Sequence, residues 1–286
     1  MARWSLQPAS SNQAQVALIP TAFGLDTQAP RAILAAGSQI SGFEPVLQVD
    51  VDDLAITQWA PFADEPPFAM CEAAVQYSLS RRQWPVLLPA MMAASLGAIR
   101  ALWKRQGSLT VVVCSAHPGL KPAAEVMDVD GDPNYSSQTW VERLYQAGIP
   151  VVHVGIRSSS KKAWEFLHSA HPTLGDTPAL FYGHAPWQPR DVLAALADGS
   201  IFLAIDCNVL DPALMPTVIN PEPGGIDWIQ LQTLIKVLFT EQQVVGVALG
   251  GLTVAETTRQ TARYAARLLN WILACHALAL TSHVQV

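Results

Sequence analysis

The stretch that decides the fold runs from Ile201 to Gly225 and reads IFLAIDCNVLDPALMPTVINPEPGG. It opens with five consecutive apolar residues and then reaches Asp206. A short, continuous apolar run without alternation indicates a strand that is buried on both faces of a parallel sheet. The residues after it are rich in Asp, Asn, Pro and Gly, which are typical of a loop. The segment therefore predicts a buried strand whose carboxyl end opens into a long polar loop.

Seven other apolar runs bounded by turn residues have the same character, and segments of helical periodicity separate most of them. The predicted strands are 15–20, 45–51, 85–88, 109–114, 149–154, 178–182, 201–206 and 244–249, and the predicted helices are 68–82, 93–106, 139–147, 161–170, 189–196, 226–240 and 255–280. Right-handed crossovers turn this alternation into an α/β fold. We expect a three-layer αβα sandwich with an eight-stranded, mostly parallel sheet, forming a single domain over residues 1–286.

The composition limits the classes of partner. Of the 286 residues 50% are hydrophobic and only 14% are charged, against about 25% in an average soluble domain. So few charges predict that part of the surface is buried against other subunits. The net charge is −6 and there is no basic run, so we expect no nucleic-acid partner.

No segment has the pattern of a membrane span, and nothing at the N-terminus resembles a signal peptide. The most apolar stretch, residues 84–99, is too short and is interrupted by Pro85 and Pro89. The first fifteen residues contain one Arg and no apolar core. The four cysteines lie far apart without CxxC spacing. These features predict a soluble, cytoplasmic protein with reduced thiols and no membrane association.

Ligands of a parallel sheet bind at the carboxyl ends of its strands. Three loops at such ends carry polar residues: 115–119, which reads SAHPG; 206–212, which reads DCNVLDP; and 221–225, which reads PEPGG. The candidate site is therefore expected at this edge of the sheet.

Residues 201–225 resemble a segment of the ureohydrolases (arginases, agmatinases and guanidinobutyrases) in which an apolar strand runs into SxDxDxxDPxxxPxxxxPEPGG. Residues 110–120, TVVVCSAHPGL, resemble the strand and loop that carry DAHxD, and residues 85–102 resemble the segment that carries GGDHS. Residues 151–157, VVHVGIR, are similar to the IGIR strand, and residues 244–269 to the last strand and helix. The resemblance covers residues 16–274 in order, and it implies the αβα fold.

The resemblance implies hydrolysis of a guanidino or amidino C–N bond by a hydroxide that bridges two manganese or nickel ions. Guanidinium is a resonance-stabilised cation and a poor electrophile, so metals must activate the water at neutral pH. Two divalent cations that share one bridging hydroxide lie close together and repel each other strongly. Anionic ligands are therefore indispensable to this chemistry.

Most of the family's ligand positions carry other residues in this sequence. The His of GGDHS is replaced, both Asp of DAHxD are replaced while the His between them is kept, and the loop of SxDxD keeps only its first Asp. Four of the six ligands are lost, and four ligand carboxylates become one. The positions that correspond to the metal site are Met92, Ser115, His117, Gly119, Asp206 and Asn208.

Two positions that correspond to the substrate site are also altered. The family's Glu at the end of the last strand falls on Gly251, and the His of its substrate loop falls on Ser137. We therefore expect no catalytic residue and no metal cofactor in this chain. His117 and Asp206 are expected to remain as a hydrogen-bonded pair, because with Asn208 they make a poor ligand set for one ion.

Other patterns allow two interpretations each. Residues 128–132, DVDGD, have the alternating acids of a calcium loop but lack its closing Glu, so a solvated turn is the alternative. Cys114 precedes Ser115 and His117 without a base placed beside it, which makes a core thiol the simpler interpretation. The nine tryptophans are consistent with a partner interface or with ordinary packing.

The leading hypothesis is a metal-free ureohydrolase-fold subunit that supports a paralogous active subunit in a trimer or hexamer. The dinuclear nickel or manganese site would lie in that partner. Bacterial metformin hydrolases pair two ureohydrolase-like polypeptides of which one has all the ligands, and this chain resembles the other one. The alternatives are a regulatory protein that binds guanidinium compounds through Asp206 and Glu222, and a self-sufficient amidine hydrolase with a rebuilt site.

Overall fold

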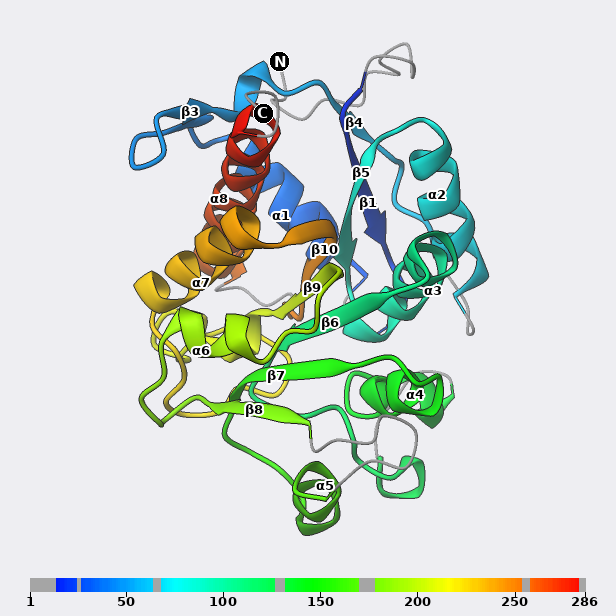
Figure 1. Cartoon of the computed structure of the whole chain (residues 1–286). Coiled ribbons are helices and arrows are strands. Elements are labelled where there is room, and N and C mark those ends of the chain that lie inside the picture. Colours follow the sequence, from blue (N-terminus) through cyan, green and yellow to red (C-terminus); the bar gives the residue numbers. More distant parts are fainter. Residues whose placement is uncertain are drawn as a thin grey trace.

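A computed structural model describes residues 14–24, 27–63, 68–126, 132–169, 178–253 and 258–282. An eight-stranded sheet crosses the molecule in the order β4-β1-β5-β10-β9-β6-β7-β8 (Figure 1). Every pairing in it is parallel. The strands are β1 (Val16–Thr21), β4 (Ile56–Gln58), β5 (Trp84–Pro89), β6 (Leu109–Cys114), β7 (Val151–Ile156), β8 (Ala179–Tyr182), β9 (Ser200–Asp206) and β10 (Gln243–Gly250).

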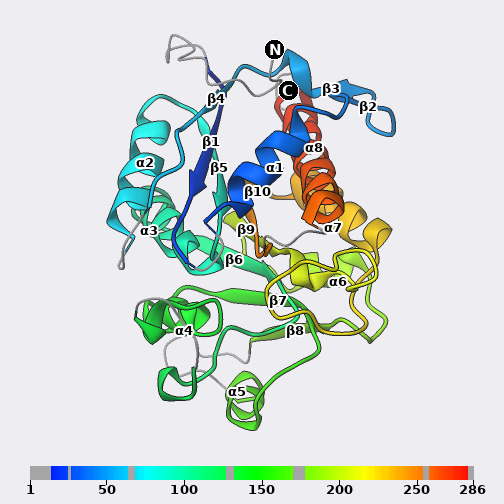
Figure 2. The ribbon, with the colours of Figure 1, turned by 180° about the vertical axis from the view of Figure 1, so that it is seen from behind.

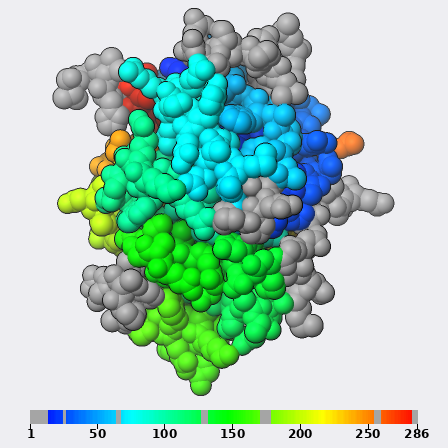
Figure 3. All heavy atoms as spheres, turned by 90° about the vertical axis from the view of Figure 1, so that its right-hand side faces the viewer, coloured from blue at the N-terminus to red at the C-terminus, as the bar shows by residue number. Residues whose placement is uncertain are grey.

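Helices cover both faces of this sheet, as Figures 1 and 2 show from opposite sides. One face carries α2 (Ala69–Ser80), α3 (Ser95–Gln106), α4 (Trp140–Gln146) and α5 (Lys161–Leu167), and the other carries α1 (Ala29–Gly37), α6 (Pro189–Ala194), α7 (Trp228–Glu241) and α8 (Thr258–Ser282). Figure 3 shows the outer surface of the first of these layers, where the cyan of α2 borders the green of the α4 region. The predicted three-layer αβα sandwich is confirmed.

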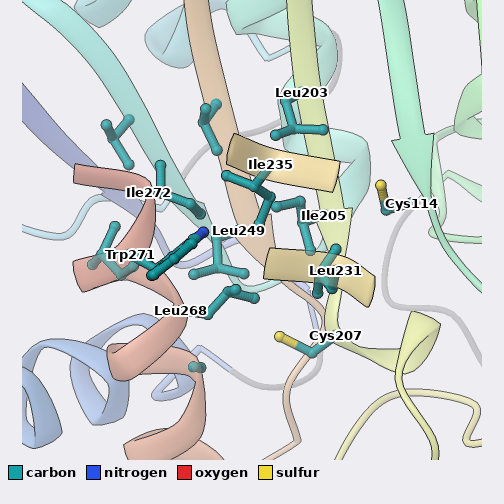
Figure 4. Packing of buried hydrophobic residues seen from close by; sticks show 14 of the residues in the cluster. Cys114, Leu203, Ile205, Cys207, Leu231, Ile235, Leu249, Leu268, Trp271 and Ile272 are labelled. Atoms are coloured by element: carbon teal, nitrogen blue, oxygen red, sulfur yellow. The ribbon is translucent and has the colours of Figure 1, made fainter. Parts of the chain in front are cut away.

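The central strands are apolar throughout because both of their faces are buried. In β5, Val86 and Leu88 belong to the core beneath α1, α7 and α8, whereas Leu87 belongs to the core beneath α2 and α3. In β9, Ile205 packs in the first of these cores, next to Leu249 of β10 and residues of α7 and α8 (Figure 4). Successive residues of a strand point to opposite faces, so each face needs its own apolar set.

One predicted strand is wrong. Residues 45–51 do not join the sheet; β2 (Phe43–Glu44) and β3 (Val49–Asp50) instead form a separate antiparallel hairpin. A 3₁₀ turn follows at Val51–Asp53, where the Asp50 carboxylate accepts a hydrogen bond from the Asp52 amide. Asp readily bonds to backbone two residues further on, and this favours a turn over a continued strand.

Two elements escaped the sequence analysis. The eighth strand of the sheet is the edge strand β4, which has three half-buried residues and pairs only with β1. The helix α1 begins with Pro30 in its first turn and has no side-chain cap. Of the helices that the structure describes, none combines the length and apolar character that crossing a bilayer requires. The calcium-like pattern at 128–131 lies outside the described residues.

Candidate functional site

The strands bring the sequence-predicted positions to one edge of the sheet. Asp206 ends β9 and is in register with Gly250 at the end of β10. Met92 begins a 3₁₀ turn just after β5, and Ser115 follows β6 directly. Because neighbouring parallel strands end at the same edge, residues far apart in sequence converge there.

Asp206 is buried, and its carboxyl group is in contact with the backbone of Gly251. Its Oδ1 accepts a hydrogen bond from the Asn208 amide nitrogen at 3.0 Å. A Cβ atom built on Gly251 would overlap that same Oδ1. Burial raises the pKa of Asp206 to about 7, although the Asn208 hydrogen bond and the charge of Arg157 act in the opposite direction. Burial therefore favours the neutral form of this carboxyl group.

Asn208 uses its side-chain amide to join three segments of chain. Its Oδ1 accepts from Ser115 Oγ at 3.1 Å and from the Ala116 amide at 3.0 Å. Its Nδ2 donates to the Ile219 carbonyl at 3.2 Å. Ser115 Oγ in turn accepts from the His117 amide. Neutral groups thus satisfy one another at positions where the family has carboxylates.

The expected pair of His117 and Asp206 does not form. The His117 Nε2 lies 3.2 Å from the Asn220 carbonyl and 3.7 Å from a Glu222 carboxylate oxygen. Burial lowers the pKa of His117, against the opposing effects of Asn220 and Glu222. The loop that follows β9 thus provides a nearer acceptor than Asp206, a contact that strand order alone does not predict.

Neighbouring side chains lie close to two of the altered positions. At Gly119 a Cβ atom would lie 2.6 Å from Val141 Cγ2, and at Gly251 it would overlap Asp206. Both glycines have positive φ, +67° and +82°, which favours glycine. Any longer side chain at either position would require the surrounding chain to move.

The remaining two positions, Met92 and Ser137, carry uncharged side chains. Met92 is fully buried in the core beneath α2 and α3. Ser137 has a buried hydroxyl group with no hydrogen-bond partner. Neither side chain supplies an anionic group to this edge of the sheet.

The donor set at this edge does not fit a two-metal centre. Of the six corresponding positions only Asp206 and His117 carry a carboxylate or an imidazole, the Glu222 carboxylate lies 3.7 Å from His117, and a thioether is too soft to suit manganese. Among the described residues, no group of three or more His, Cys, Asp or Glu side chains is placed to hold a metal ion. The charge needed to neutralise two neighbouring divalent cations is therefore not supplied by these side chains.

Arg157 organises the loops beside these positions, and the sequence analysis did not single it out. Among the described residues, its guanidinium donates to six backbone carbonyl groups from three segments of chain and to no carboxylate. The acceptors are the carbonyls of Gly155, Asn208, Val209, Leu210, Glu222 and Pro223, at 2.7–3.2 Å. A lone Arg directly after a buried strand was the available signal for this role.

A pocket of about 560 Å³ opens next to His117. Its charged and polar lining includes Lys121, Gln138 and Glu222 together with the hydroxyl-bearing segment 158–160. Asp206 is not among the described residues that line it. Of the two carboxylates expected to hold a guanidinium compound, only Glu222 therefore faces this pocket.

The cysteines have no features of nucleophiles. All four are buried. Burial raises the pKa of the Cys114 and Cys275 thiols to about 12, and it raises the pKa of Cys207 as well. Thiols with such pKa values stay protonated and unreactive at neutral pH.

The all-parallel sheet, its two helical layers and the polar loops at its carboxyl edge define an arginase-like α/β fold. The agmatine ureohydrolase of Thermoplasma volcanium has this fold: its crystal structure superposes with a TM-score of 0.82 at 18% identity, covering 99% of this chain and 97% of that one. Proclavaminate amidino hydrolase from Streptomyces clavuligerus superposes with a TM-score of 0.78 at 16% identity, over 93% of each chain.

The sequence comparisons define the family. Residues 25–275 match the profile of the Arginase family. The N(1)-aminopropylagmatine ureohydrolase of Thermus thermophilus is 25% identical over 248 residues, which cover 82% of this chain and 81% of that protein. The agmatinase of Bacillus subtilis is 25% identical over 254 residues, which cover 85% and 83%. This chain belongs to the arginase family and is agmatinase-like.

Proposed function

We propose that this chain is a metal-free, catalytically degenerate ureohydrolase-fold subunit that assembles with a paralogous active subunit. The observation that carries the proposal is the packing at the altered metal-site and substrate-site positions. A Cβ atom at Gly119 would meet the Val141 side chain, one at Gly251 would meet the Asp206 carboxyl group, and Asn208 bonds to neutral partners. A site awaiting two cations would instead keep several carboxylates directed at a common point.

In this proposal the partner subunit supplies the chemistry. It carries dinuclear nickel or manganese, and the complex hydrolyses a guanidine or biguanide, such as metformin, to urea plus an amine. The relatives named for agmatine and aminopropylagmatine support that reaction class for the partner. The sparse charge of this chain, 14% of its residues, supports a trimer or hexamer. The burial of all four thiols is in keeping with the cytoplasm.

The test is urea release by the purified chain, with manganese or nickel added, and with agmatine, guanidinobutyrate and metformin as substrates. We expect no release by the chain alone. We expect release when the chain is co-expressed with a ureohydrolase of the same organism that has all six ligands, with the two proteins eluting together at a fixed ratio. Turnover by the chain alone would contradict the proposal and favour a self-sufficient hydrolase with a rebuilt site.

The pocket beside His117 favours a second candidate function, the binding of a guanidinium compound without turnover. Glu222 would supply the carboxylate, and its side chain lines the pocket. Titration calorimetry with agmatine tests this candidate on the purified chain. Saturable binding that is lost in Glu222→Gln and kept in Glu241→Gln would support a regulatory role. Glu241 is the control because it ends α7, away from the pocket.

A further inference from the structure

A groove of about 340 Å³ lies between α7, α8 and the hairpin of β2 and β3. Two aromatic rings dominate it: Trp228 of α7 and Tyr264 of α8, whose centroids are 6.1 Å apart. Leu214 and Gln232 also line the groove, together with the charged residues Glu44 and Arg267. An apolar groove with a few charged groups is the kind of surface that receives a partner's side chains.

Exposed apolar side chains occur on two of the elements that border this groove. The side chains of Val46 and Phe43 on the hairpin are 71% and 47% exposed, and Ile229, next to Trp228 in the chain, is 66% exposed. These are three of the seven large exposed hydrophobics among the described residues. Apolar groups that cluster on one face indicate an interface, whereas scattered ones do not.

The hairpin of β2 and β3 projects from the surface and carries exposed apolar side chains, as the groove has an apolar lining. It has only two residues in each strand and projects from the body of the molecule beside α8 (Figures 1 and 2). Asn270 Nδ2 of α8 donates a hydrogen bond to the Gly42 carbonyl at 3.4 Å, and Leu47 anchors the hairpin turn in the core. A two-stranded hairpin of this size is marginally stable by itself. An apolar projection and an apolar groove thus lie side by side on one face.

The charges on this face identify the occupant. Glu44 and Arg267 line the same groove, yet no ion pair joins them, and the only described acceptor role of the Glu44 side chain is toward the Val46 amide. In a two-fold arrangement the same surface meets itself, so Glu44 of one copy meets Arg267 of the other. A surface that carries a projection, a groove and both charges is complementary to its own copy.

We propose that this face, formed by the β2–β3 hairpin, α7 and α8, docks a second copy of this chain. The hairpin of each copy inserts Val46 into the groove of the other, and Glu44 pairs with Arg267 across the interface. The inference rests on the proposed function of the chain as an assembling subunit, and it names the surface and the contact.

The test is the association state of the purified full chain, measured by sedimentation velocity between about 1 and about 100 μM. We expect a concentration-dependent dimer or higher assembly. Val46→Glu combined with Ile229→Glu should raise the dissociation constant at least about tenfold, because charges would be buried without partners. Met70→Glu is the control: Met70 is 54% exposed on α2, on the opposite side of the sheet.

A charge exchange makes the test specific to this geometry. Glu44→Arg and Arg267→Glu should each weaken association, and the double exchange should restore it to within about threefold, since opposite charges would again meet. Melting temperatures of all variants check that each remains folded.

Three outcomes would overturn the inference. A wild type that stays monomeric at every concentration excludes self-docking, and assembly with the ureohydrolase paralogue alone makes that paralogue the occupant. Self-association that Val46→Glu with Ile229→Glu leaves unchanged places the contact elsewhere. Urea release by the chain alone is a separate result, which would contradict the proposed function without moving this interface.

Discussion

Two neighbouring regions at the carboxyl edge of the sheet differ in what holds them together. Arg157 fixes one region with a full positive charge that is shared among six carbonyl groups. The other region, which contains Asp206 and Gly251, is held by the neutral side chains of Asn208 and Ser115 and by the close approach of the Asp206 carboxyl group to Gly251. The difference teaches that a charged side chain secures one set of loops at this edge, whereas neutral hydrogen bonds secure the other.

The largest expected effect comes from removing the charged region. Arg157→Met leaves six carbonyls without their donor and should lower the free energy of unfolding by about 5 kcal/mol. Arg157→Lys should recover little of it, because an ammonium group cannot reach acceptors spread over three segments. Arg190→Met, on the exposed surface of α6, should change stability by less than about 0.5 kcal/mol.

Urea denaturation of the three variants measures these differences. A loss below about 1 kcal/mol in Arg157→Met would mean that the loops are held by something else, and it would remove the basis of the comparison.

The second prediction concerns the charge of Asp206. Its folded-state pKa is about 7, above the usual 3.8, so the folded chain binds more protons than the unfolded chain between those values. Its contribution to stability is therefore fully present below about pH 4 and is lost as the pH rises to about 7. The loss amounts to about 4 kcal/mol for a shift of this size.

Asp206→Asn keeps the acceptor for the Asn208 amide and should remove this pH dependence. Stability of both proteins from pH 4 to 8, compared as a difference, isolates Asp206 from other groups. The comparison is needed because two buried histidines also titrate: burial lowers the pKa of His153 to about 3 and that of His276 to about 4. The unfolded chain therefore binds more protons than the folded chain at these histidines below about pH 6.5, so their contribution makes stability rise with pH there. A difference that does not vary with pH would show that Asp206 is ionised throughout.

The third prediction restores a family ligand. Asn208→Asp places a second carboxylate near Asp206 and leaves the Ile219 carbonyl without its donor, so we expect a loss of about 2–3 kcal/mol. Added manganese should not raise the melting temperature of the variant. Stabilisation by manganese would show that the neighbouring groups still form a metal site.

The smallest expected effect separates crowding from backbone strain. Gly251→Ala should cost about 2 kcal/mol, because the new Cβ displaces the Asp206 carboxyl group in addition to the strain of a positive φ. Gly224→Ala has a similar φ of +74° but open space around it, and should cost about 1 kcal/mol. Thermal unfolding of both variants decides the point, and equal losses would mean that Gly251 is not crowded.

Much of this fold was predictable because burial on both faces requires a continuous apolar run in a strand, as in β5, β6 and β9. The edge strand β4 was not, since its three residues are half-buried and carry no such constraint. The hairpin at residues 43–50 was taken for a sheet strand because its valines and leucine resemble one, and the turn-forming role of Asp50 was not considered.

The site was predictable in position but not in detail. The motif around Asp206 placed it at the carboxyl edge, where the structure has it. The contact of Asp206 with Gly251, the reach of Arg157 to three segments and the turn of His117 toward Asn220 depend on how separate loops meet. No pattern within one segment of sequence encodes such contacts.

The most direct test of the central claim is the metal content of the purified chain after incubation with manganese and nickel, measured by elemental analysis. The proposed metal-free subunit predicts a content near zero for each metal, with no change in melting temperature. A content near two ions per chain would contradict it, and would show that this chain holds a two-metal centre of its own.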